Sequence, residues 1–516
     1  MMPCCRTAVS CCILRPFAVI ADGLLMTRLF PLRPGGLVAS VLCLVVTLCL
    51  DVHTAREQNK AAQATRRPNI LLAIADDWSW PHAGAYGDPT VKTPVFDRIA
   101  REGALFTHAF AAAPSCTPSR AALLTGRYPH QLEEGGVLHG FLPDKFPVYT
   151  DLLERAGYYV GYTRKGWGPG RFEPGGRPRN PAGVQFGDFD AFLRGRPAGQ
   201  PFVFWFGSQD PHRPYEEGSG AASGIDLASI RVPTFLPDTP EVRGDLADYF
   251  FEVQRFDREV GQILERLRTL GELDNTLVVI TADNGMPFPR AKANVYDSGA
   301  RLPFAMRWPG RVRPGLVADA FINLSDLAPT FLEAAGLTPP ESMSARSILG
   351  LAAGGSEQGR DRVFVERERH AHVRAGNLSY PVRAVRTDEW LYIRNFRPDR
   401  WPAGDPEMVF SVGPYGDIDG GVSKTLLLER RNDPAIARFF ALATAIRPAE
   451  ELYDLKTDPD QLTNVAADPG RSGAKANLRR MLDEWMRTTG DPRATVDDDR
   501  WDRYPYYGQP GTAPAR

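Results

Sequence analysis

Short apolar runs alternate with amphipathic stretches between residues 66 and 375. Four of these runs have the length of a buried parallel strand, namely 69–75, 158–163, 201–206 and 276–281. Between them the spacing of apolar residues predicts helices that begin at Thr93-Pro94, at Cys116, near residue 148 and near residue 243. Strands that alternate with helices are typical of an α/β fold, in which helices flank a mostly parallel sheet.

The pattern changes after about residue 375. Residues 382–387 and 390–395 predict a β-hairpin, 451–455 another short strand, and 474–487 a helix. We therefore expect a main domain over 66–375 and a smaller C-terminal α+β subdomain with an antiparallel sheet over 376–516. Residues 497–516 are rich in Asp, Tyr and Pro, and predict an irregular tail.

The first 65 residues differ from the rest of the chain. A charge-free apolar run at 37–50 follows Arg28 and Arg33 and ends at Asp51, with a small residue for cleavage at Ala55. At about 14 residues the run is shorter than the roughly 20 that span a bilayer. Residues 1–65 therefore predict a signal peptide and polar spacer, with an uncleaved anchor as the alternative. We expect a secreted or periplasmic protein, and Met26 is an alternative start.

Charge and cysteine content narrow the function. The formal net charge of -1 argues against general nucleic-acid binding, which needs a clustered positive excess. Six of the seven Cys residues lie in the leader, so Cys116 is the single Cys after it. An exported chain with one Cys cannot form an internal disulfide. Its thiol is a leftover, a buried apolar group or a reacting group.

Acidic side chains follow two predicted core strands. Asp76 and Asp77 end the strand at 69–75, and Asp283 and Asn284 follow the strand at 276–281. Ligand sites of parallel sheets gather at the carboxyl ends of strands. Oxygen ligands suit a hard cation such as calcium or magnesium, although Asp at a strand end also starts ordinary turns. Two such pairs favour the metal site over the turns.

The residues around the lone Cys form a motif. The chain reads Cys116-Thr-Pro118-Ser119-Arg120, followed after four residues by Thr125-Gly126. This resembles the sulfatase signature Cys-x-Pro-Ser-Arg-x-x-x-x-Thr-Gly over its full length. The resemblance, which covers roughly residues 67–490, implies an alkaline-phosphatase-like fold and oxidation of Cys116 to formylglycine by a formylglycine-generating enzyme.

The chemistry explains why such a nucleophile is needed. A diol on a divalent cation is more acidic than an ordinary alcohol, because the metal favours the alkoxide. After its attack on sulfur, the second hydroxyl can lose a proton, and the adduct collapses to aldehyde and sulfate. A serine would form a stable sulfate ester and stall.

The resemblance assigns roles to further residues. It implies calcium ligands at Asp76, Asp77, Asp283, Asn284 and the modified Cys116, and it places Arg120 beside the diol. Lys165 and Lys292 fit the sulfate-binding lysines. His212, in Asp210-Pro-His212-Arg213-Pro, is the expected general acid, because a departing nitrogen or oxygen needs a proton.

Within the sulfatases the chain is most similar to the sulfamidases, which are N-sulfoglucosamine sulfohydrolases. The supporting segments are 283–289, 380–383 and 451–454. This subgroup implies removal of the N-sulfate of glucosamine in heparan-type saccharides. The expected substrate-binding residues are His139, Arg213, His370 and Arg383.

One position departs from the family pattern. Many sulfatases have Lys-x-His where this chain has Lys165-Gly-Trp167, so the base for the collapse step is missing. His130, just after the Cys116 helix, is the expected substitute.

Several alternatives stay open at this point. An O-sulfate esterase acting on another glycan, a phosphonate or phosphate ester hydrolase, and an inactive glycan-binding relative all share much of this pattern. A two-metal phosphatase would need further His and Asp ligands, which the sequence does not offer. The sequence does not decide the oligomeric state, and a homodimer is one open expectation.

Overall fold

The computed structural model describes residues 67–410, 413–496 and 498–509. The predicted signal peptide and spacer lie outside these residues, so export stays a prediction. In the described part of the chain, no helix is long and apolar enough to cross a membrane.

A nine-stranded sheet forms the centre of the protein. Its strand order is β4-β3-β5-β1-β6-β8-β2-β7, and β9 pairs with β2 off this path. The strands are β1 (Asn69–Ala75), β2 (Ala104–Phe110), β3 (Tyr159–Arg164), β4 (Val184–Phe186), β5 (Phe202–Gly207), β6 (Thr276–Ala282), β7 (Arg301–Leu302), β8 (Ala305–Arg307) and β9 (Leu316–Asn323). The pairs β1–β5, β1–β6, β3–β5, β3–β4 and β2–β9 are parallel. Both β7 and β8 pair antiparallel with β2, and β8 also pairs antiparallel with β6.

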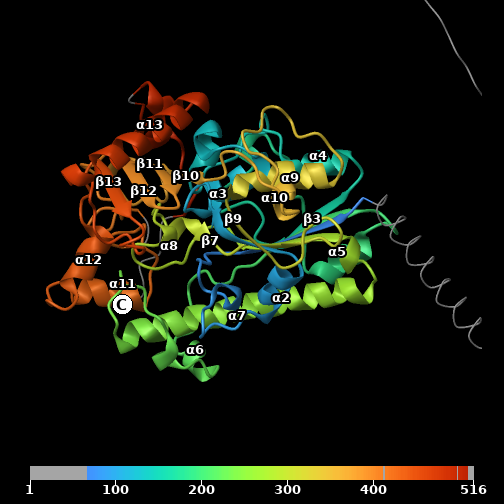
Figure 1. The fold of residues 1–516 in the computed structure, drawn as a ribbon, viewed down its shortest axis with the longest axis horizontal. Coiled ribbons are helices and arrows are strands. Elements are labelled where there is room, and N and C mark those ends of the chain that lie inside the picture. The colour runs from blue at the N-terminus through green and yellow to red at the C-terminus, as the bar shows by residue number, and fades with distance from the viewer. Residues whose placement is uncertain (1–66, 411–412, 497, 510–516) are drawn as a thin grey trace, which may run out of the picture. The chain divides into compact units, whose positions relative to one another are not determined.

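Helices cover both faces of this sheet. On one side run α2 (Pro94–Glu102) and the long α7 (Pro240–Thr269), and on the other lie α3 (Cys116–Thr125), α4 (Tyr149–Arg155) and α9 (Leu327–Ala334) (Figure 1). Because both faces are covered, β1, β5 and β6 are buried along their whole length and are apolar throughout. Shorter helices are α5 (Phe189–Gly195), α6 (Ser219–Ala222), α8 (Asp297–Ala300) and α10 (Leu349–Ala352).

A second sheet is antiparallel, with the order β10-β11-β12-β13. Its strands are β10 (Arg362–Arg367), β11 (Val382–Thr387), β12 (Trp390–Asn395) and β13 (Glu450–Asp454). One face packs on the main domain through a cluster that includes Phe110, Tyr296 and Phe321. The other face is covered by α13 (Ser472–Thr488) through Leu482 and Trp485. Both faces of this sheet are apolar, and the sheet therefore packs between the main domain and α13.

The remaining C-terminal elements are short. They are α11 (Val422–Glu429), α12 (Ala437–Thr444) and α14 (Arg500–Arg503). Together with the loop that precedes it, α11 packs near the start of α7, where Ser423 donates to the Asp245 carboxylate at 2.6 Å. This contact brings a distant part of the chain to the carboxyl edge of the main sheet.

The predicted fold class is confirmed. The structure has a mixed, mostly parallel sheet flanked by helices and a separate antiparallel sheet. The hairpin of β11 and β12 lies at the predicted residues, and the long helix begins at Pro240 because Thr239 caps it. The second sheet takes its first strand, β10, from before residue 376, and the described residues belong to one compact unit. In the described part of the tail, 498–509, α14 lies between irregular segments.

Candidate active site

The site begins at the carboxyl ends of the neighbouring strands β1 and β6. Asp76 and Asp77 follow β1, and Asp283 and Asn284 follow β6. Because the two strands run parallel in register from Asn69–Thr276 to Ala75–Ala282, both pairs reach the same edge. The Asp283 carboxylate accepts from the backbone amides of Asp77 (3.1 Å) and Asn284 (2.8 Å), which joins the two turns.

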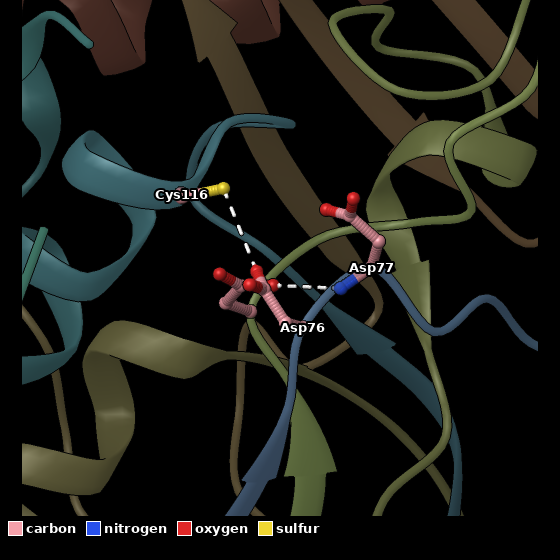
Figure 2. A group of neighbouring side chains, drawn as sticks. Asp76, Asp77 and Cys116 are labelled. Atoms are coloured by element: carbon pink, nitrogen blue, oxygen red, sulfur yellow. Dashed lines mark hydrogen bonds between the residues drawn. The ribbon is translucent and has the colours of Figure 1, made fainter. Parts of the chain in front are cut away.

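Cys116 is the first residue of α3 and points into this acidic cluster. Its Sγ lies 3.7 Å from Oδ1 of Asp76, which Figure 2 shows as a dashed line. Ligand atoms of Asp76, Asp77, Asp283 and Cys116 all lie within 4.8 Å of one another. Burial raises the pKa of the Cys116 thiol well above its ordinary value. The unmodified thiol is therefore a weak nucleophile, because only the thiolate reacts readily.

Arg120 lies one turn further along α3 and holds the cluster together. Its Nε donates to Oδ2 of Asp283 at 2.7 Å, and one Nη lies 3.7 Å from Asp76. The other Nη donates to the carbonyls of Lys165 (3.0 Å) and Gly166 (2.9 Å). The guanidinium thus ties α3 to the ends of three strands, β1, β3 and β6, and it is fully buried.

Two lysines neutralise the aspartates of β1. Lys165 Nζ donates to both carboxylate oxygens of Asp76, at 2.6 and 2.5 Å. Lys292 Nζ donates to Asp77 Oδ2 at 2.7 Å and lies 3.0 Å from Oδ2 of Asp419. Buried carboxylates need such partners, since an unpaired charge away from water is costly.

The charges of the two aspartates respond differently to this environment. Burial would raise the pKa of Asp76, but Lys165, His212 and Arg120 hold it well below its ordinary value. Burial raises the pKa of Asp77 to about 6, although Lys292 and His212 oppose the rise. Asp76 is therefore firmly ionised, whereas Asp77 is held less firmly in its charged form and takes up a proton when the pH falls below about 6.

The donor set fits a hard divalent cation. Three carboxylates converge on one point, and Asn284 Oδ1 is buried without a hydrogen-bond partner among the described residues. Buried polar atoms are rarely left unpaired, so this amide oxygen is available as a ligand. Carboxylate and amide oxygens are the ligands of calcium and magnesium. The cation would also supply the positive charge that Asp77 lacks.

His212 faces the same cluster from the loop after β5. Its Nδ1 lies 2.6 Å from the carbonyl oxygen of Arg213, so Nδ1 carries a proton and donates it there. Its Nε2 is 3.8 Å from Asp77 Oδ2. Nε2 is therefore the ring atom that is free to exchange a proton with a bound molecule.

A cavity of about 830 Å³ opens over these groups. Its wall includes Asp76, Cys116, Lys165, His212, Lys292 and Asp419, and also His139, Trp167, Arg213, Arg255, His370 and Tyr506. The volume is in the range of sites for small organic ligands. Asp76, Cys116 and the two lysines lie on this wall, so a molecule in the cavity meets them, whereas Asp77 and Asp283 lie beneath the wall.

Comparisons with known proteins agree with this geometry. A family model described as sulfatase matches residues 68–170 and 184–337, and one described as N-sulphoglucosamine sulphohydrolase, C-terminal, matches 290–406. Human N-sulphoglucosamine sulphohydrolase is 31% identical over 484 residues, which cover 84% of this chain and 92% of that protein. The chain belongs to the sulfatase family.

Two further comparisons concern a glycan-active sulfatase and a protein solved with a sulfated sugar. An ulvan-active sulfatase of Formosa agariphila is 27% identical over 88% of this chain and 81% of its own length. A solved structure in complex with its substrate D-glucosamine-2-N,6-O-disulfate superposes with a TM-score of 0.60 at 18% identity, over 84% of this chain and 100% of that one. The structural likeness supports the expected alkaline-phosphatase-like fold, and membership of the sulfatase family makes the protein a sulfatase, which is a hydrolase.

The structure brings together most residues that the sequence singled out. The predicted metal ligands, Cys116, Arg120, Lys165, Lys292 and His212 form one cluster, as described above. His139, Arg213 and His370 line the same cavity. Arg213 is committed to Asp245, with two 2.7 Å contacts, and His370 Nδ1 pairs with Ser115 Oγ at 2.8 Å. Their individual roles stay predictions.

His130 does not reach the cavity, and its expected role as substitute base needs correction. Its Nδ1 is 3.0 Å from both carboxylate oxygens of Glu366, and its Nε2 is 3.4 Å from the carbonyl of Thr489. Both ring nitrogens are thus engaged with the C-terminal subdomain. Trp167, at the departing position, is buried in the cavity wall, where its indole cannot accept a proton. His370 lines the cavity and pairs with Ser115, the residue that precedes Cys116.

Arg383 also needs correction as a substrate-binding residue. It is 0% exposed and does not line the cavity. Its guanidinium contacts Asp491 at 2.6 Å, Glu368 at 2.7 Å and Glu366 at 3.1 Å. A planar guanidinium can pair with a sugar carboxylate or with a buried protein carboxylate, and the Arg383 guanidinium pairs with protein carboxylates.

Asp419 and Tyr506 are cavity residues that the sequence did not reveal. Asp419 lies in an Asp-Ile-Asp-Gly-Gly segment typical of a turn, more than a hundred residues from Lys292. Tyr506 lies in the tail, and its ring packs on the ring of His139 with 4.9 Å between the centroids. Only the tertiary fold brings these positions to the site, and no local pattern marks them.

The buried contacts of Arg383 lead to a stability prediction. We expect Arg383→Met to lower the free energy of unfolding by about 3–5 kcal/mol, because it strands buried carboxylates without a partner. Arg362→Met, at the partly exposed start of β10 in the same sheet, should cost less than about 1 kcal/mol. Chemical denaturation measures both. A raised KM with unchanged stability in Arg383→Met would restore the substrate-binding interpretation.

The oxygen cluster predicts metal-dependent stability. Calcium at a hundred times its dissociation constant should raise the unfolding free energy of the wild-type protein by about 2.7 kcal/mol. We expect Asp283→Asn to lose most of this gain, whereas Asp274→Asn, an exposed carboxylate before the same strand, should keep it. Thermal unfolding with calcium and with chelator measures the effect. An equal calcium response in both variants would place the ion elsewhere.

Proposed function

We propose that this sulfatase removes the N-sulfate of a terminal glucosamine from heparan-type saccharides, with Cys116 oxidised to formylglycine and calcium at the oxygen cluster. The observation that carries the catalytic part is the convergence of Cys116 Sγ with three carboxylates and two lysines at the end of one cavity. The substrate part rests on similarity along nearly the full length of human N-sulphoglucosamine sulphohydrolase.

The modified residue and the cation, once present, would supply a strong oxygen nucleophile and a Lewis acid at the sulfur. The chain's own residues do the rest. Lys165 and Lys292 offer ammonium groups to the sulfate oxygens, where negative charge develops. Arg120 fixes the Asp283 carboxylate and the start of α3, so that the reacting group stays aligned with the metal ligands.

His212 supplies the proton that the leaving group needs. Nitrogen is a poor leaving group unless it is protonated, so cleavage of an S–N bond requires an acid at that atom. Nε2 of His212 faces the cavity while Nδ1 is held by the Arg213 carbonyl. The ring is therefore oriented to deliver its Nε2 proton to the departing amine.

An O-sulfate ester is the second candidate substrate. The ulvan-active sulfatase of Formosa agariphila covers as much of the chain as the human relative does, at slightly lower identity. The same lysines, cation and acid would serve an oxygen leaving group. The two candidates differ only in the atom that leaves.

The nucleophile can be tested by mass. In active protein the peptide of Cys116 should be about 18 Da lighter than the unmodified cysteine form. Cys116→Ser should lose turnover and accumulate a sulfate ester on the serine, because that ester cannot collapse. Full turnover by the serine variant would contradict the mechanism. Mass analysis of the N-terminal peptide from the same digest identifies the mature N-terminus and so tests the proposed export.

A saccharide panel decides the substrate. We expect sulfate release from N-sulfoglucosamine at the non-reducing end, and a rate at least roughly 100-fold lower for 6-O-sulfo and 2-O-sulfo saccharides, because the site is proposed to fit an amine leaving group. Ion chromatography of released sulfate measures each rate. Release only from the O-linked positions would refute the N-sulfate assignment and leave the sulfatase activity intact.

A further inference from the structure

Asp419 occupies a place in the cavity that neither the metal site nor the sulfate-binding lysines explain. It lies beyond the residues that either family model matches. Its carboxylate is 3.0 Å from Lys292 Nζ, which also contacts Asp77 at 2.7 Å. Side-chain ligand atoms of Asp419, Asp77 and His212 lie within 4.8 Å of one another. Asp419 therefore stands where the sulfate-binding end of the cavity meets the space for the leaving group.

The segment that carries Asp419 is firmly anchored. The buried Asp417 accepts from Arg374 at 2.7 Å and from the Ala371 amide at 3.1 Å. Lys424 donates to the carbonyl of Ile418 at 2.7 Å. These bonds on both sides of Asp419 hold its backbone in one position.

The same segment fits tightly against the loop of the general acid. A Cβ added at Gly421 would lie 2.3 Å from Nη1 of Arg213, the neighbour of His212. Arg213 and Ser423 share the Asp245 carboxylate, through contacts of 2.7 and 2.6 Å. Asp419 and His212 thus come from segments that are fixed relative to each other.

The Asp419 carboxylate has unused hydrogen-bond capacity. Apart from the Lys292 ion pair, no hydrogen bond from the described residues reaches either of its oxygens, and Oδ2 is buried. Burial would raise the pKa of Asp419, but Lys292, His212 and His370 hold it well below its ordinary value. The Asp419 side chain is 21% exposed and lines the cavity, so this ionised carboxylate can accept hydrogen bonds from a molecule that enters it.

The chemistry of the substrate restricts what those donors are. A sulfate group offers only acceptor oxygens and negative charge, so it cannot satisfy a carboxylate and is repelled by it. The sugar offers hydroxyl groups, and an amino sugar also offers an N–H. After the sulfate leaves, the amine can carry positive charge, which a carboxylate attracts.

We propose that Asp419 is a specificity-determining residue whose carboxylate accepts hydrogen bonds from the sugar that bears the sulfate, foremost from the nitrogen at the cleaved bond. The proposal rests on the proposed function in naming nitrogen as that atom. The contact selects an amino sugar and retains the free amine of the product.

The test compares Asp419→Asn with wild-type enzyme, each in full length and with Cys116 modified. The substrates are N-sulfoglucosamine and an aryl sulfate that has no hydroxyl or amine donors. We expect kcat/KM for N-sulfoglucosamine to fall roughly 10- to 100-fold, while that for the aryl sulfate changes less than about threefold, because only the sugar can donate to Asp419. Asp433→Asn, a surface carboxylate of the same subdomain, is the matched control and should change neither value.

Inhibition by the reaction products distinguishes two roles of Asp419, namely direct contact with the sugar and positioning of Lys292. In Asp419→Asn the inhibition constant of glucosamine should rise at least about tenfold, that of N-acetylglucosamine should rise less because it lacks the ammonium charge, and that of inorganic sulfate should change little. If Asp419 acts only through Lys292, inorganic sulfate and the aryl sulfate weaken as much as the sugar, and the proposal is overturned. Unchanged values throughout overturn it as well.

Failure of the proposed function gives a different result. Wild-type enzyme would then cleave an O-sulfated sugar in place of N-sulfoglucosamine. The same comparison is repeated with that sugar and the aryl sulfate. A loss confined to the sugar supports the Asp419 contact with a hydroxyl as donor and refutes nitrogen, whereas an equal loss or none refutes the contact itself.

Discussion

The whole site depends on keeping several buried carboxylates close together. Asp76, Asp77 and Asp283 lie within a few ångströms at the ends of β1 and β6, where their mutual repulsion is strong because little water screens it. Lys165, Lys292 and Arg120 oppose that repulsion through direct contacts. The balance is incomplete at Asp77, and a divalent cation is the natural complement.

This constraint explains why distant parts of the chain meet at one place. The parallel pairing of β1 with β6 brings the aspartates together, and α3 adds Cys116 and Arg120 from above the same edge. Lys292, which is buried, pairs with Asp419 from the C-terminal part as well as with Asp77. The second sheet and its helices therefore do more than stabilise the main domain, since the segment before α11 closes the cavity.

Local sequence predicts the catalytic end of the site well. Residues at strand ends and in the Cys116 motif have positions set by short-range structure, so Asp76, Asp283 and Arg120 could be identified before any fold was known. The core strands and the hairpin of β11 and β12 were predictable for the same reason, because apolar runs and their spacing are local. The edge strand β10 and the elements α11 and α12 were missed, since their form depends on what they pack against.

The errors share one cause, which also bears on how specificity arises. His130 and Arg383 have the right chemistry for catalysis or sugar binding, but each is drawn into the buried ion pairs of Glu366, Glu368 and Asp491. Asp419 has an unremarkable local sequence, yet it is the one that faces the cavity. Residue type alone cannot separate these cases, because a charged group is structural or functional according to whether its partners are all within the protein. The sulfate-binding end, built on strand termini, is thus separable from the sugar-facing wall, which long-range loops supply. Substitutions in that wall can alter the preferred sugar without disturbing the paired charges that hold the nucleophile and the metal ligands.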